Sequence, residues 1–593
     1  MTAAPAPTVS SLSAPAKGRP RPQARWVPTP TPDAEVGAAL GRELLLPASI
    51  CHLLAARGHV APEAAKRYLR PRLEQLHEPG RLPGMRAAAD RLARAVRAGE
   101  TIFVHGDYDV DGMCSTSLLV RVLRGLGGHA VPFIPHRIRD GYDLTDAGVR
   151  AAIEAKASVV VTCDCGTSAL APVEALCAAG IDVIVSDHHL PGRAHALPQC
   201  LAVLNPNLPD GDYPQADRGL AAVGVAFKLA LAVSRLLGGP DAAVMRLLDL
   251  VALASIADIA PLRGENRVLA RYGLRMLAES TLPGIRALVR ASGLDGKPLT
   301  AGRVGFILAP RLNAVGRLGH ALRGVELLTT DDEHQAHAIA RELEELNRQR
   351  QEIDRATLDA ARRQVDALDL DATYGLVLAA EGWHPGVIGI VASRVVEETA
   401  RPTVMVAIED GVGKGSGRSI PAFDLHAALS ACDAAGLFQR FGGHRAAAGV
   451  TLDAARIPAF AERFNQVARE RLTPEDLVPE VRVDLELPID DATEELELLL
   501  RHFEPFGVGN AAPVLVSRDV SIAGAPRLVG SDGLRLRLRR AAGELDAIGW
   551  GLAPRLASLD PRRPVDVAYR LERDEYRGES RLQARVVDVA QPR

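Results

Sequence analysis

Residues 101–112 read TIFVHGDYDVDG, an apolar run followed by Asp107, Asp109 and Asp111. The run has the length and composition of a buried strand, so the three acids are expected where that strand ends. Two carboxylates about 4 Å apart repel each other by about 4 kcal/mol at the dielectric typical near a protein surface. A bound cation would turn this repulsion into attraction. The stretch therefore predicts a strand with a cation-binding site at its carboxyl end.

Short apolar runs alternate with helical patterns on both sides of this stretch, from about residue 85 to 290. The strand-like runs include AVPFIP, ASVVVTCD, IDVIVSDHH and CLAVLNP, and TSALAPVEALCAAG is one of the helical segments between them. Alternation of this kind indicates a mostly parallel sheet with helices on both faces. We expect this α/β unit to occupy residues 45–330.

The remaining sequence divides into segments of different character. Residues 331–368 are highly charged, contain no Gly or Pro, and predict a connector helix that spans solvent. Residues 369–472 predict a second α/β unit. Residues 473–593 alternate apolar and polar side chains with short turns, which indicates a small antiparallel barrel or sandwich. Residues 1–44 are rich in Pro and Ala at their start, and we expect them to form a disordered tail.

Composition limits the possible functions. At 593 residues the chain is too long for one core and suggests about three or four domains. The net charge is −3, so any surface that binds nucleic acid must be a local patch. The 7 cysteines are scattered and form no CxxC motif, which argues against a disulfide framework or a zinc cage and favours the reducing cytoplasm. No apolar run reaches the roughly 18 residues of a membrane span.

Acids and histidines recur where successive strands are expected to end. Asp164 follows ASVVVT, the Asp187–His189 segment follows IDVIVS, and Asp258 lies in the apolar segment VALASIADIAPL. Each motif alone has a structural explanation: a turn or helix cap, a hydrogen-bonded histidine pair, or a satisfied buried acid. Together they fall at one edge of the predicted sheet, where ligands bind in open α/β folds. Carboxylates with a minority of imidazoles favour Mg²⁺ or Mn²⁺, and two such ions suit phosphoryl transfer.

These motifs resemble a known family. HGDYDVDG, TCDCG, SDHH and the segment with Asp258 resemble, in order, the motifs of the DHH phosphoesterases, and GKGSGRS with FGGHRAAAG resembles their DHHA1 substrate-binding domain. FIPHRIRDGY, FILAPRLNAVGR, WHPGVIGIVASR and FEPFGVGNAAP resemble more narrowly the bacterial RecJ exonucleases, which degrade single-stranded DNA from its 5′ end. The resemblance implies a DHH catalytic domain, a DHHA1 domain and a C-terminal OB-fold barrel, and it covers nearly all of the chain.

The resemblance also implies roles for individual residues. The ligands of two divalent metal ions, Mn²⁺ or Mg²⁺, would be His105, Asp109, Asp111, Asp164, His188 and Asp258. Asp164 would bridge the two ions, and His189 would contact the scissile phosphate and stabilise its developing charge. Asp107 belongs to the extended first motif, and we assign it a catalytic role in support of the ligands, because the HxxxDxD spacing is already filled.

A second set of residues is expected to bind the nucleic acid. Guanidinium groups suit phosphate oxygens, although an exposed arginine in an Arg-rich protein can also have no ligand. Trp383 could stack on a base or pack in a core with about equal weight. The full set is Arg137, Arg311, Asn313, Arg317, Ser416, Arg418, His444 and Trp383. We expect the arginines to recognise a 5′-terminal phosphate and so to set the direction of digestion.

The leading interpretation is an exonuclease that degrades single-stranded DNA to mononucleotides in repair and recombination. One alternative is a DHH enzyme for short oligoribonucleotides or cyclic dinucleotides, but such enzymes resemble only the first two domains. Another is an inactive scaffold in replication, although every candidate ligand is present. The resemblance suggests a single-strand-binding protein and a RecQ-type helicase as partners. Some relatives carry a further domain whereas this sequence stops at Arg593, which leaves those contacts open. We expect a cytoplasmic monomer.

Overall fold

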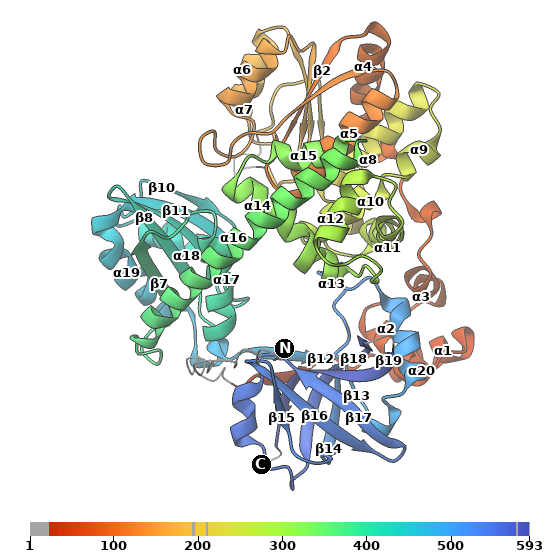
Figure 1. The fold of residues 1–593 in the computed structure, drawn as a ribbon, viewed down its shortest axis with the longest axis vertical. Coiled ribbons are helices and arrows are strands. Elements are labelled where there is room, and N and C mark those ends of the chain that lie inside the picture. The colour runs from red at the N-terminus through yellow and green to blue at the C-terminus, as the bar shows by residue number, and fades with distance from the viewer. Residues whose placement is uncertain (1–22, 192–195, 209–211, 577–578, 592–593) are drawn as a thin grey trace, which may run out of the picture.

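The structure is a computed structural model that describes residues 23–191, 196–208, 212–576 and 579–591. Figure 1 shows a first body at the top, a second body at the left and a C-terminal β-rich region at the bottom. The long helix α16 runs from the first body to the second. In these ranges, none of the helices is both long enough and apolar enough to cross a membrane.

The first body is built on a five-stranded parallel sheet with the order β3-β2-β4-β5-β6. The strands are β2 (Thr101–Gly106), β3 (His129–Phe133), β4 (Val159–Cys163), β5 (Asp182–Ser186) and β6 (Ala202–Leu204). One face packs on α4 (Met85–Ala98), α5 (Val110–Gly125) and α8 (Ala222–Leu236), and the other on α6 (Asp146–Glu154) and α7 (Leu170–Ala178). Burial on both faces explains the nearly continuous apolar runs and confirms the predicted sheet.

Further helices complete the first body. They are α9 (Asp241–Met245), α10 (Leu248–Ala257), α11 (Gly264–Ala278), α12 (Pro283–Ala291), α13 (Ala301–Arg303), α14 (Ala309–Leu318) and α15 (Leu322–Thr329). A π-helical turn, Val304–Leu308, joins α13 to α14 without a break. Helix α10 is almost wholly buried against α5, α8 and α11, which is why its sequence is apolar throughout. It ends at Asp258, which is its C-cap residue.

Helix α16 (Glu333–Asp366) is the predicted connector, but it does not span solvent. Its first half buries Ile339 and Leu343 in the core of the first body, next to α12, α14 and α15. Its second half buries Leu358 and Ala361 in the second body, against α17 (Ile388–Thr399) and β7 (Leu376–Glu381). The helix therefore joins the two bodies by packing against both.

The second body contains a five-stranded sheet with the order β10-β11-β9-β8-β7. Its remaining elements are β8 (Thr403–Glu409), β9 (Val412–Arg418), β10 (Arg440–Gly443), β11 (Ala447–Asp453), α18 (Leu425–Asp433) and α19 (Ile457–Arg471). Only β7 and β8 run parallel, and the other pairs are antiparallel. The first six residues of GKGSGRS thus lie in strand β9, in the middle of the sheet.

The C-terminal region has a seven-stranded sheet with the order β13-β14-β18-β19-β17-β16-β15, beside helix α20 (Glu494–Leu500). The strands are β13 (Leu485–Glu486), β14 (Leu515–Val520), β15 (Arg527–Val529), β16 (Gly533–Arg540), β17 (Gly543–Gly549), β18 (Val565–Tyr576) and β19 (Glu579–Ala590). In β16 the leucines are buried and the arginines between them lie outside, as the period-two pattern predicts. The expectation of an entirely antiparallel sheet is wrong, because β13–β14 and β17–β19 pair in parallel.

The prediction of a disordered tail over residues 1–44 is wrong for residues 23–44. Strand β1 (Arg25–Pro28) pairs in parallel with β12 (Glu480–Val483), and α1 (Ala34–Leu44) follows with Asp33 as its N-cap. Leu40 is buried with residues of α2 (Ala48–Ala56) and α3 (Pro62–Leu69) against the C-terminal sheet. These segments are ordered by partners from the other end of the chain. Residues 1–22 of the predicted tail lie outside the described residues.

Candidate metal centre

Candidate ligands follow three neighbouring strands of the first sheet. Asp107 and Asp109 come after β2, Asp164 after β4, and the Asp187–His189 segment after β5. Strands β2, β4 and β5 are adjacent and parallel, so their carboxyl ends meet at one edge. Asp258 reaches the same edge from the end of α10, because its Oδ2 lies 3.7 Å from His188 Nε2. The predicted convergence of these motifs is confirmed.

Among the described residues, three groups of side chains have ligand atoms within 4.8 Å of one another. They are Asp164, His188 and His189; Asp111, His188 and Asp258; and Asp107, Asp109 and Asp164. Asp164 belongs to two groups and so does His188, and His188 Nε2 lies 3.2 Å from Asp164 Oδ1. The three groups therefore form one continuous centre, in which Asp164 has the shared position that a bridging ligand requires.

Three atoms of this centre are buried and have no hydrogen-bond partner: Asp107 Oδ1, Asp164 Oδ1 and His188 Nε2. Buried polar atoms are almost always paired, because leaving one unpaired costs roughly 1–3 kcal/mol. Here the unpaired atoms are lone-pair donors that belong to the three groups. Mixed carboxylate and imidazole donors fit a divalent cation such as Mn²⁺ or Mg²⁺. The residues present therefore fit the metal ions that the sequence predicts.

The backbone around the first motif explains its spacing. Asp109 is the N-cap of α5, and its Oδ1 accepts from the N–H groups of Asp111 and Gly112 at 2.9 and 3.1 Å. Asp111 accepts from the N–H groups of Ala222 and Val223 at the start of α8, at 2.7 and 2.8 Å. A Cβ on Gly112 would lie 2.5 Å from the Asp107 backbone, so a glycine is required there. The capping interpretation of the aspartates is thus correct for Asp109, which also belongs to a ligand group.

Burial makes four acids of the centre, Asp107, Asp111, Asp164 and Asp258, hold their protons when no cation is near. It is the largest cause in each case, followed by the charges of the other acids, and it raises the pKa of Asp111 to about 7 and of Asp258 to about 9. The pKa values of Asp107 and Asp164 are also raised well above the ordinary value. Burial lowers the pKa of His188 to about 4, so its imidazole is neutral and able to bind a metal. The centre is therefore built for an added positive charge.

His189 is held in place by a residue to which sequence reasoning gave no role. His189 Nδ1 lies 2.8 Å from Asp187 Oδ1, and Asp187 Oδ2 accepts from the Thr167 N–H at 3.0 Å. Burial opposes protonation of His189, but the bond and charge of Asp187 outweigh it and raise the pKa of His189 to about 9. The Tyr142 hydroxyl lies 3.0 Å from His189 Nε2. Asp187 precedes the histidine pair in SDHH, so its place beside them was visible in the sequence, whereas the approach of Tyr142 was not.

His105 was expected as a ligand, but it belongs to none of the three groups. Its ring lies near Phe133, with centroids 5.3 Å apart, and its Nδ1 lies 3.6 Å from Cys165 Sγ. A Cβ on Gly148 in α6 would lie 2.6 Å from His105 Nε2, so this nitrogen faces α6. Burial lowers the pKa of His105 to about 4. Asp107 was expected only to support the ligands. In the structure it forms a ligand group with Asp109 and Asp164, and His105 is not part of that group.

Three predicted phosphate-binding arginines gather between the first and second bodies. Arg137 lies over the Tyr108 ring at 4.6 Å, and Arg317 Nη1 donates to the Gly386 carbonyl at 2.6 Å. Burial, and then the charges of Arg137, Arg350 and Arg418, lower the pKa of Arg317 to about 10. Burial and Arg137 also lower the pKa of Arg418. Like charges held this close while partly buried favour an anion between them.

The first turn of α17 meets the same cluster. A Cβ on Gly389 would lie 2.8 Å from Ser416 Oγ and 3.1 Å from Arg418 Nη2. Arg418 Nη1 lies 3.2 Å from Ser416 Oγ, so both predicted residues of β9 face the start of a helix of 12 residues. Backbone N–H groups and the dipole at a helix start favour anions. Asn313 accepts from the Val110 N–H at 3.2 Å and thereby joins α14 to the metal centre.

The remaining predicted residues lie elsewhere or have other partners. Arg311 forms an ion pair with Glu344 of α16 and donates to the Ile307 carbonyl at 2.5 Å. Trp383 is buried in the core of the second body, so the packing interpretation is correct and its ring is not free to stack. His444 is exposed on the β10–β11 hairpin. Trp383 therefore has a structural role, and the role of Arg311 in phosphate binding stays a prediction.

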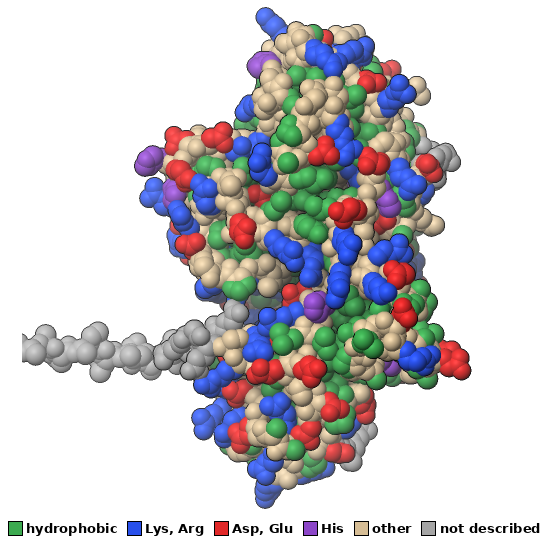
Figure 2. All heavy atoms as spheres, turned by 90° about the vertical axis from the view of Figure 1, so that its right-hand side faces the viewer, with side chains coloured by type: hydrophobic (Ala, Val, Ile, Leu, Met, Phe, Trp, Pro, Cys, Tyr) green, Lys and Arg blue, Asp and Glu red, His purple; other side chains and the backbone are tan. Residues whose placement is uncertain are grey.

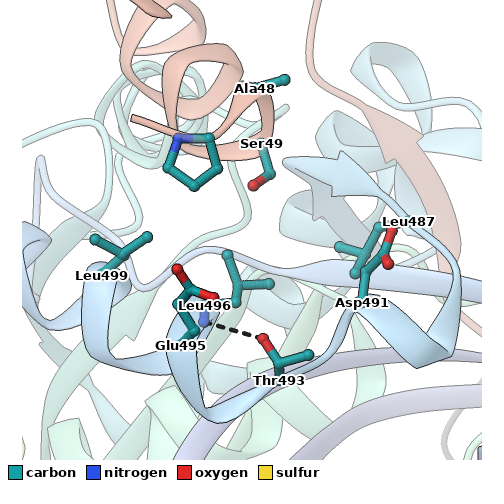
Figure 3. Close-up of a pocket in the computed structure, with 9 residues that line it drawn as sticks. Ala48, Ser49, Leu487, Asp491, Thr493, Glu495, Leu496 and Leu499 are labelled. Carbon is teal, nitrogen blue, oxygen red and sulfur yellow. Dashed lines mark hydrogen bonds between the residues drawn. The ribbon is translucent and has the colours of Figure 1, made fainter. Parts of the chain in front are cut away.

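Two other surface features bear on ligand binding. Basic side chains gather in the middle of one face (Figure 2). This grouping agrees with the expectation of local basic patches on a chain of net charge −3. The pocket in Figure 3 lies between the start of α2 and α20, and it is lined by leucines with Asp491 and Glu495 at its edge. These two acids would repel a phosphate, and none of the ligand groups borders it.

Family models match three parts of the chain. Residues 101–255 match the DHH family N-terminal domain, residues 372–470 the DHHA1 domain, and residues 483–588 the RecJ OB domain. The single-stranded-DNA-specific exonuclease RecJ of Escherichia coli K12 is 37% identical over 91% of this chain and 95% of its own length. The enzyme of the same name from Bacillus subtilis 168 is 35% identical over 94% of this chain and 70% of its own length.

Crystal structures of two RecJ complexes are also similar to this chain. The crystal structure of RecJ in complex with Mn²⁺ from Thermus thermophilus matches with a TM-score of 0.81 at 34% identity, over 96% of this chain and 80% of that one. The corresponding Mg²⁺ complex matches with a TM-score of 0.77 at 32% identity, over 96% of this chain and 79% of that one. With matches to family models over three parts of the chain and identities of this size over nearly its full length, the chain belongs to the RecJ family of DHH proteins.

Proposed function

We propose that the chain is a metal-dependent exonuclease that degrades single-stranded DNA from its 5′ end to mononucleotides, in DNA repair and recombination. The observation that carries this function is the acid and histidine centre with its unpaired buried atoms, close to a cluster of arginines. The relatives named single-stranded-DNA-specific exonucleases support the choice of substrate. The seven-stranded C-terminal sheet supports it further, because digestion of very short oligonucleotides needs no such region.

The centre would hold two divalent ions. Asp107, Asp109 and Asp164 would hold one, and Asp111, His188 and Asp258, with Asp164 shared, would hold the other. Two such ions, when bound, stabilise both the attacking and the leaving oxygens of a phosphodiester and help to activate water. The three groups consist of carboxylates and imidazoles without a thiolate, so the hard cations Mn²⁺ and Mg²⁺ suit them.

His189 would act on the scissile phosphate itself. The Asp187 carboxylate keeps this imidazole protonated and fixes its ring, which leaves Nε2 free to donate towards a phosphate oxygen in place of Tyr142. A charged donor aimed at the oxygen where negative charge develops favours the transition state more than the ground state. His189 would therefore stabilise charge during cleavage, and Asp187 would position it.

The arginine cluster would fix the direction of digestion. Arg418 and Ser416 lie with the first turn of α17 in the second body, and Arg137 lies over Tyr108 in the first body. Arg317 of α14 joins the two bodies through the Gly386 carbonyl. A terminal phosphate carries more charge than an internal one, so a site made of guanidinium groups and a helix start would favour a 5′-phosphate end. The bond cut at the metal centre would then be the one next to that end.

The test uses a 3′-labelled DNA strand with a 5′-phosphate, a blunt duplex of the same sequence and an oligoribonucleotide, each with Mn²⁺. The chain should shorten only the single DNA strand, from its 5′ end, and Asp164→Asn should abolish the reaction. A strand with a 5′-hydroxyl should be degraded more slowly, and Arg418→Met should remove that preference. Cleavage confined to the oligoribonucleotide, or cleavage that persists in Asp164→Asn, would contradict the proposal.

The protein partners and the assembly state are separate proposals. A monomer is expected, and sedimentation of the full chain tests it. A single-strand-binding protein and a RecQ-type helicase are the proposed partners, and the location is proposed to be the cytoplasm. Co-purification with each purified partner, compared with a matched protein that binds no DNA, would test these contacts directly.

A further inference from the structure

Two asparagines, Asn205 and Asn207, follow β6 at the edge of the first sheet. The Asp187 N–H donates to the Leu204 carbonyl at 3.0 Å, so the bonds between β5 and β6 continue past the end of β5. This bond brings the asparagines beside the histidine pair that follows Asp187. Asn205 is completely buried and Asn207 is half-buried. A buried amide needs partners for its polar atoms, so its partners show what the residue holds.

The asparagine amides donate to the backbone of the histidine pair. Asn205 Nδ2 donates to the His189 carbonyl at 2.8 Å, and Asn207 Nδ2 donates to the His188 carbonyl at 2.5 Å. Asn205 Oδ1 also accepts from the Asn207 N–H at 2.8 Å, which fixes the second asparagine through the first. We call Asn205 and Asn207 the amide clamp.

The N–H groups of the same two histidines are held by Asp187. Its Oδ1 accepts from the His188 N–H at 2.7 Å and from the His189 N–H at 3.1 Å. Together with the amide clamp, this gives side-chain partners to all four backbone polar groups of the pair. A backbone held in this way cannot turn without losing several bonds at once, so the two imidazole rings keep a fixed direction.

Asn205 also closes a ring of hydrogen bonds around His189. Its Nδ2 donates to Thr167 Oγ1 at 3.0 Å, and the Thr167 N–H donates to Asp187 Oδ2 at 3.0 Å. Asp187 Oδ1 in turn lies 2.8 Å from His189 Nδ1, and the His189 carbonyl returns to Asn205. Thr167 follows β4, so the ring joins the segments that follow the neighbouring strands β4, β5 and β6.

We propose that Asn205 and Asn207 are positioning residues of the metal centre: Asn205 aims the His189 imidazole at the scissile phosphate, and Asn207 fixes His188 as a metal ligand. This inference rests on the proposed function and adds two residues that act through the histidines. Loss of such an orienting partner typically costs about 10-fold to 100-fold in metal affinity or activity. The two asparagines hold different histidines, so their loss should appear in different measurements.

The first test uses Asn→Asp substitutions, which keep the size of the side chain and its Oδ1 acceptor but remove the Nδ2 donors. Asn205→Asp should lower kcat on 5′-phosphorylated single-stranded DNA by about 10-fold, and its Mn²⁺ affinity in calorimetry should equal that of the parent. Asn207→Asp should weaken Mn²⁺ binding by about 10-fold. An added negative charge alone would strengthen the binding of a cation, so a weaker affinity reports the lost hydrogen bond.

Asn465→Asp is the matched control. Asn465 Nδ2 donates to the Ala372 carbonyl at 3.3 Å, and its Oδ1 accepts from the Tyr374 N–H at 2.8 Å. This asparagine therefore also holds backbone groups, but in the second body. The variant should keep the kcat and the Mn²⁺ affinity of the parent. Urea unfolding of each variant gives the folded fraction to which both values are referred.

The second test combines Asn205→Asp with Asp187→Asn. Both residues hold His189, so the double variant should have nearly the kcat of Asp187→Asn alone, because changes that act through one shared group are not additive. Losses of kcat that multiply would overturn the positioning role of Asn205. An unchanged kcat in Asn205→Asp with an unchanged Mn²⁺ affinity in Asn207→Asp would overturn the whole inference.

A purely structural role predicts a different result. In that case both variants would lose kcat, Mn²⁺ affinity and resistance to urea to the same degree, and this result would also overturn the inference. A parent that binds Mn²⁺ but does not degrade single-stranded DNA would contradict the proposed function itself. The Mn²⁺ affinity of Asn207→Asp would then still test the amide clamp, because that measurement needs no DNA.

Discussion

Two buried polar clusters in the first body contrast sharply. In one, Glu265 accepts from Lys228 Nζ at 2.7 Å, from the His77 N–H at 2.5 Å and from the Tyr213 hydroxyl. In the other, the acids of the metal centre face one another, and Asp107 Oδ1 and Asp164 Oδ1 have no hydrogen-bond partner. Both clusters lie in the same core, so burial alone does not distinguish them. The difference is that the first cluster satisfies itself, whereas the second is satisfied only by an added cation.

The contrast predicts that substitutions in the two clusters have opposite effects on activity and stability. The largest expected effect is on the activity of the metal centre. Asp164→Asn should lower the rate of DNA hydrolysis by at least about 100-fold, because even groups that only support metal ligands contribute up to that much. Its free energy of unfolding without metal should stay within about 1 kcal/mol of the parent, since the acid it replaces already holds a proton there. Rate assays and urea unfolding in EDTA measure both quantities. A strongly destabilised variant would show that Asp164 is a structural acid.

Lys228→Met should have the reverse effect, lowering stability and leaving the metal centre unchanged. It leaves Glu265 buried without its cationic partner, which should lower the free energy of unfolding by about 3 kcal/mol. The Mn²⁺ affinity of the folded fraction should not change, because Lys228 touches no residue of the metal centre. Urea unfolding and metal titration of the same sample report the two values. Unchanged stability would contradict the structural role given to this pair.

Asp187→Asn should have a smaller effect within the site. The variant keeps the size of the side chain but loses the charge that orients His189, so kcat should fall by about 10-fold. The KM for single-stranded DNA should change little, because Asp187 is covered and lies behind His189. Steady-state kinetics separate the two constants. A change in KM alone would place Asp187 in substrate binding.

Metal binding should depend on pH with a definite sign. The pKa values of Asp111 and Asp258 are raised to about 7 and about 9, mainly by burial, so each proton must leave before a cation binds. Raised pKa values mean that the metal-free fold loses stability as pH rises from about 4 to 9, while the metal-bound fold does not. The Tm difference between Mn²⁺ and EDTA samples should therefore grow between about pH 6 and about pH 8. A difference that shrinks would contradict the assignment.

Much of the metal centre could be predicted from the sequence because a parallel sheet brings its strand ends together. Asp107, Asp164 and His188 each follow a buried strand, and the fold leaves them no other edge. The role of His105 stays a prediction, because this residue lies within β2 itself, where side chains alternate between faces, and its ring turns towards α6. Spacing alone did not show which way that ring points.

Contacts between distant segments could not be predicted from the sequence. Arg311 is paired by Glu344 of α16, and Trp383 lies in a core that forms only when α16 packs on the second body. Residues 23–44 fold because the C-terminal sheet region covers them.

The most direct measurement is a Mn²⁺ titration of the full chain followed by calorimetry and electron paramagnetic resonance, with Asp164→Asn and Lys228→Met as the two comparisons. We predict that the parent and Lys228→Met bind two ions with the magnetic coupling of a shared carboxylate, and that Asp164→Asn loses the coupling and most of the affinity. Equal binding by Asp164→Asn, or no binding by the parent, would contradict the account of the centre as a metal site.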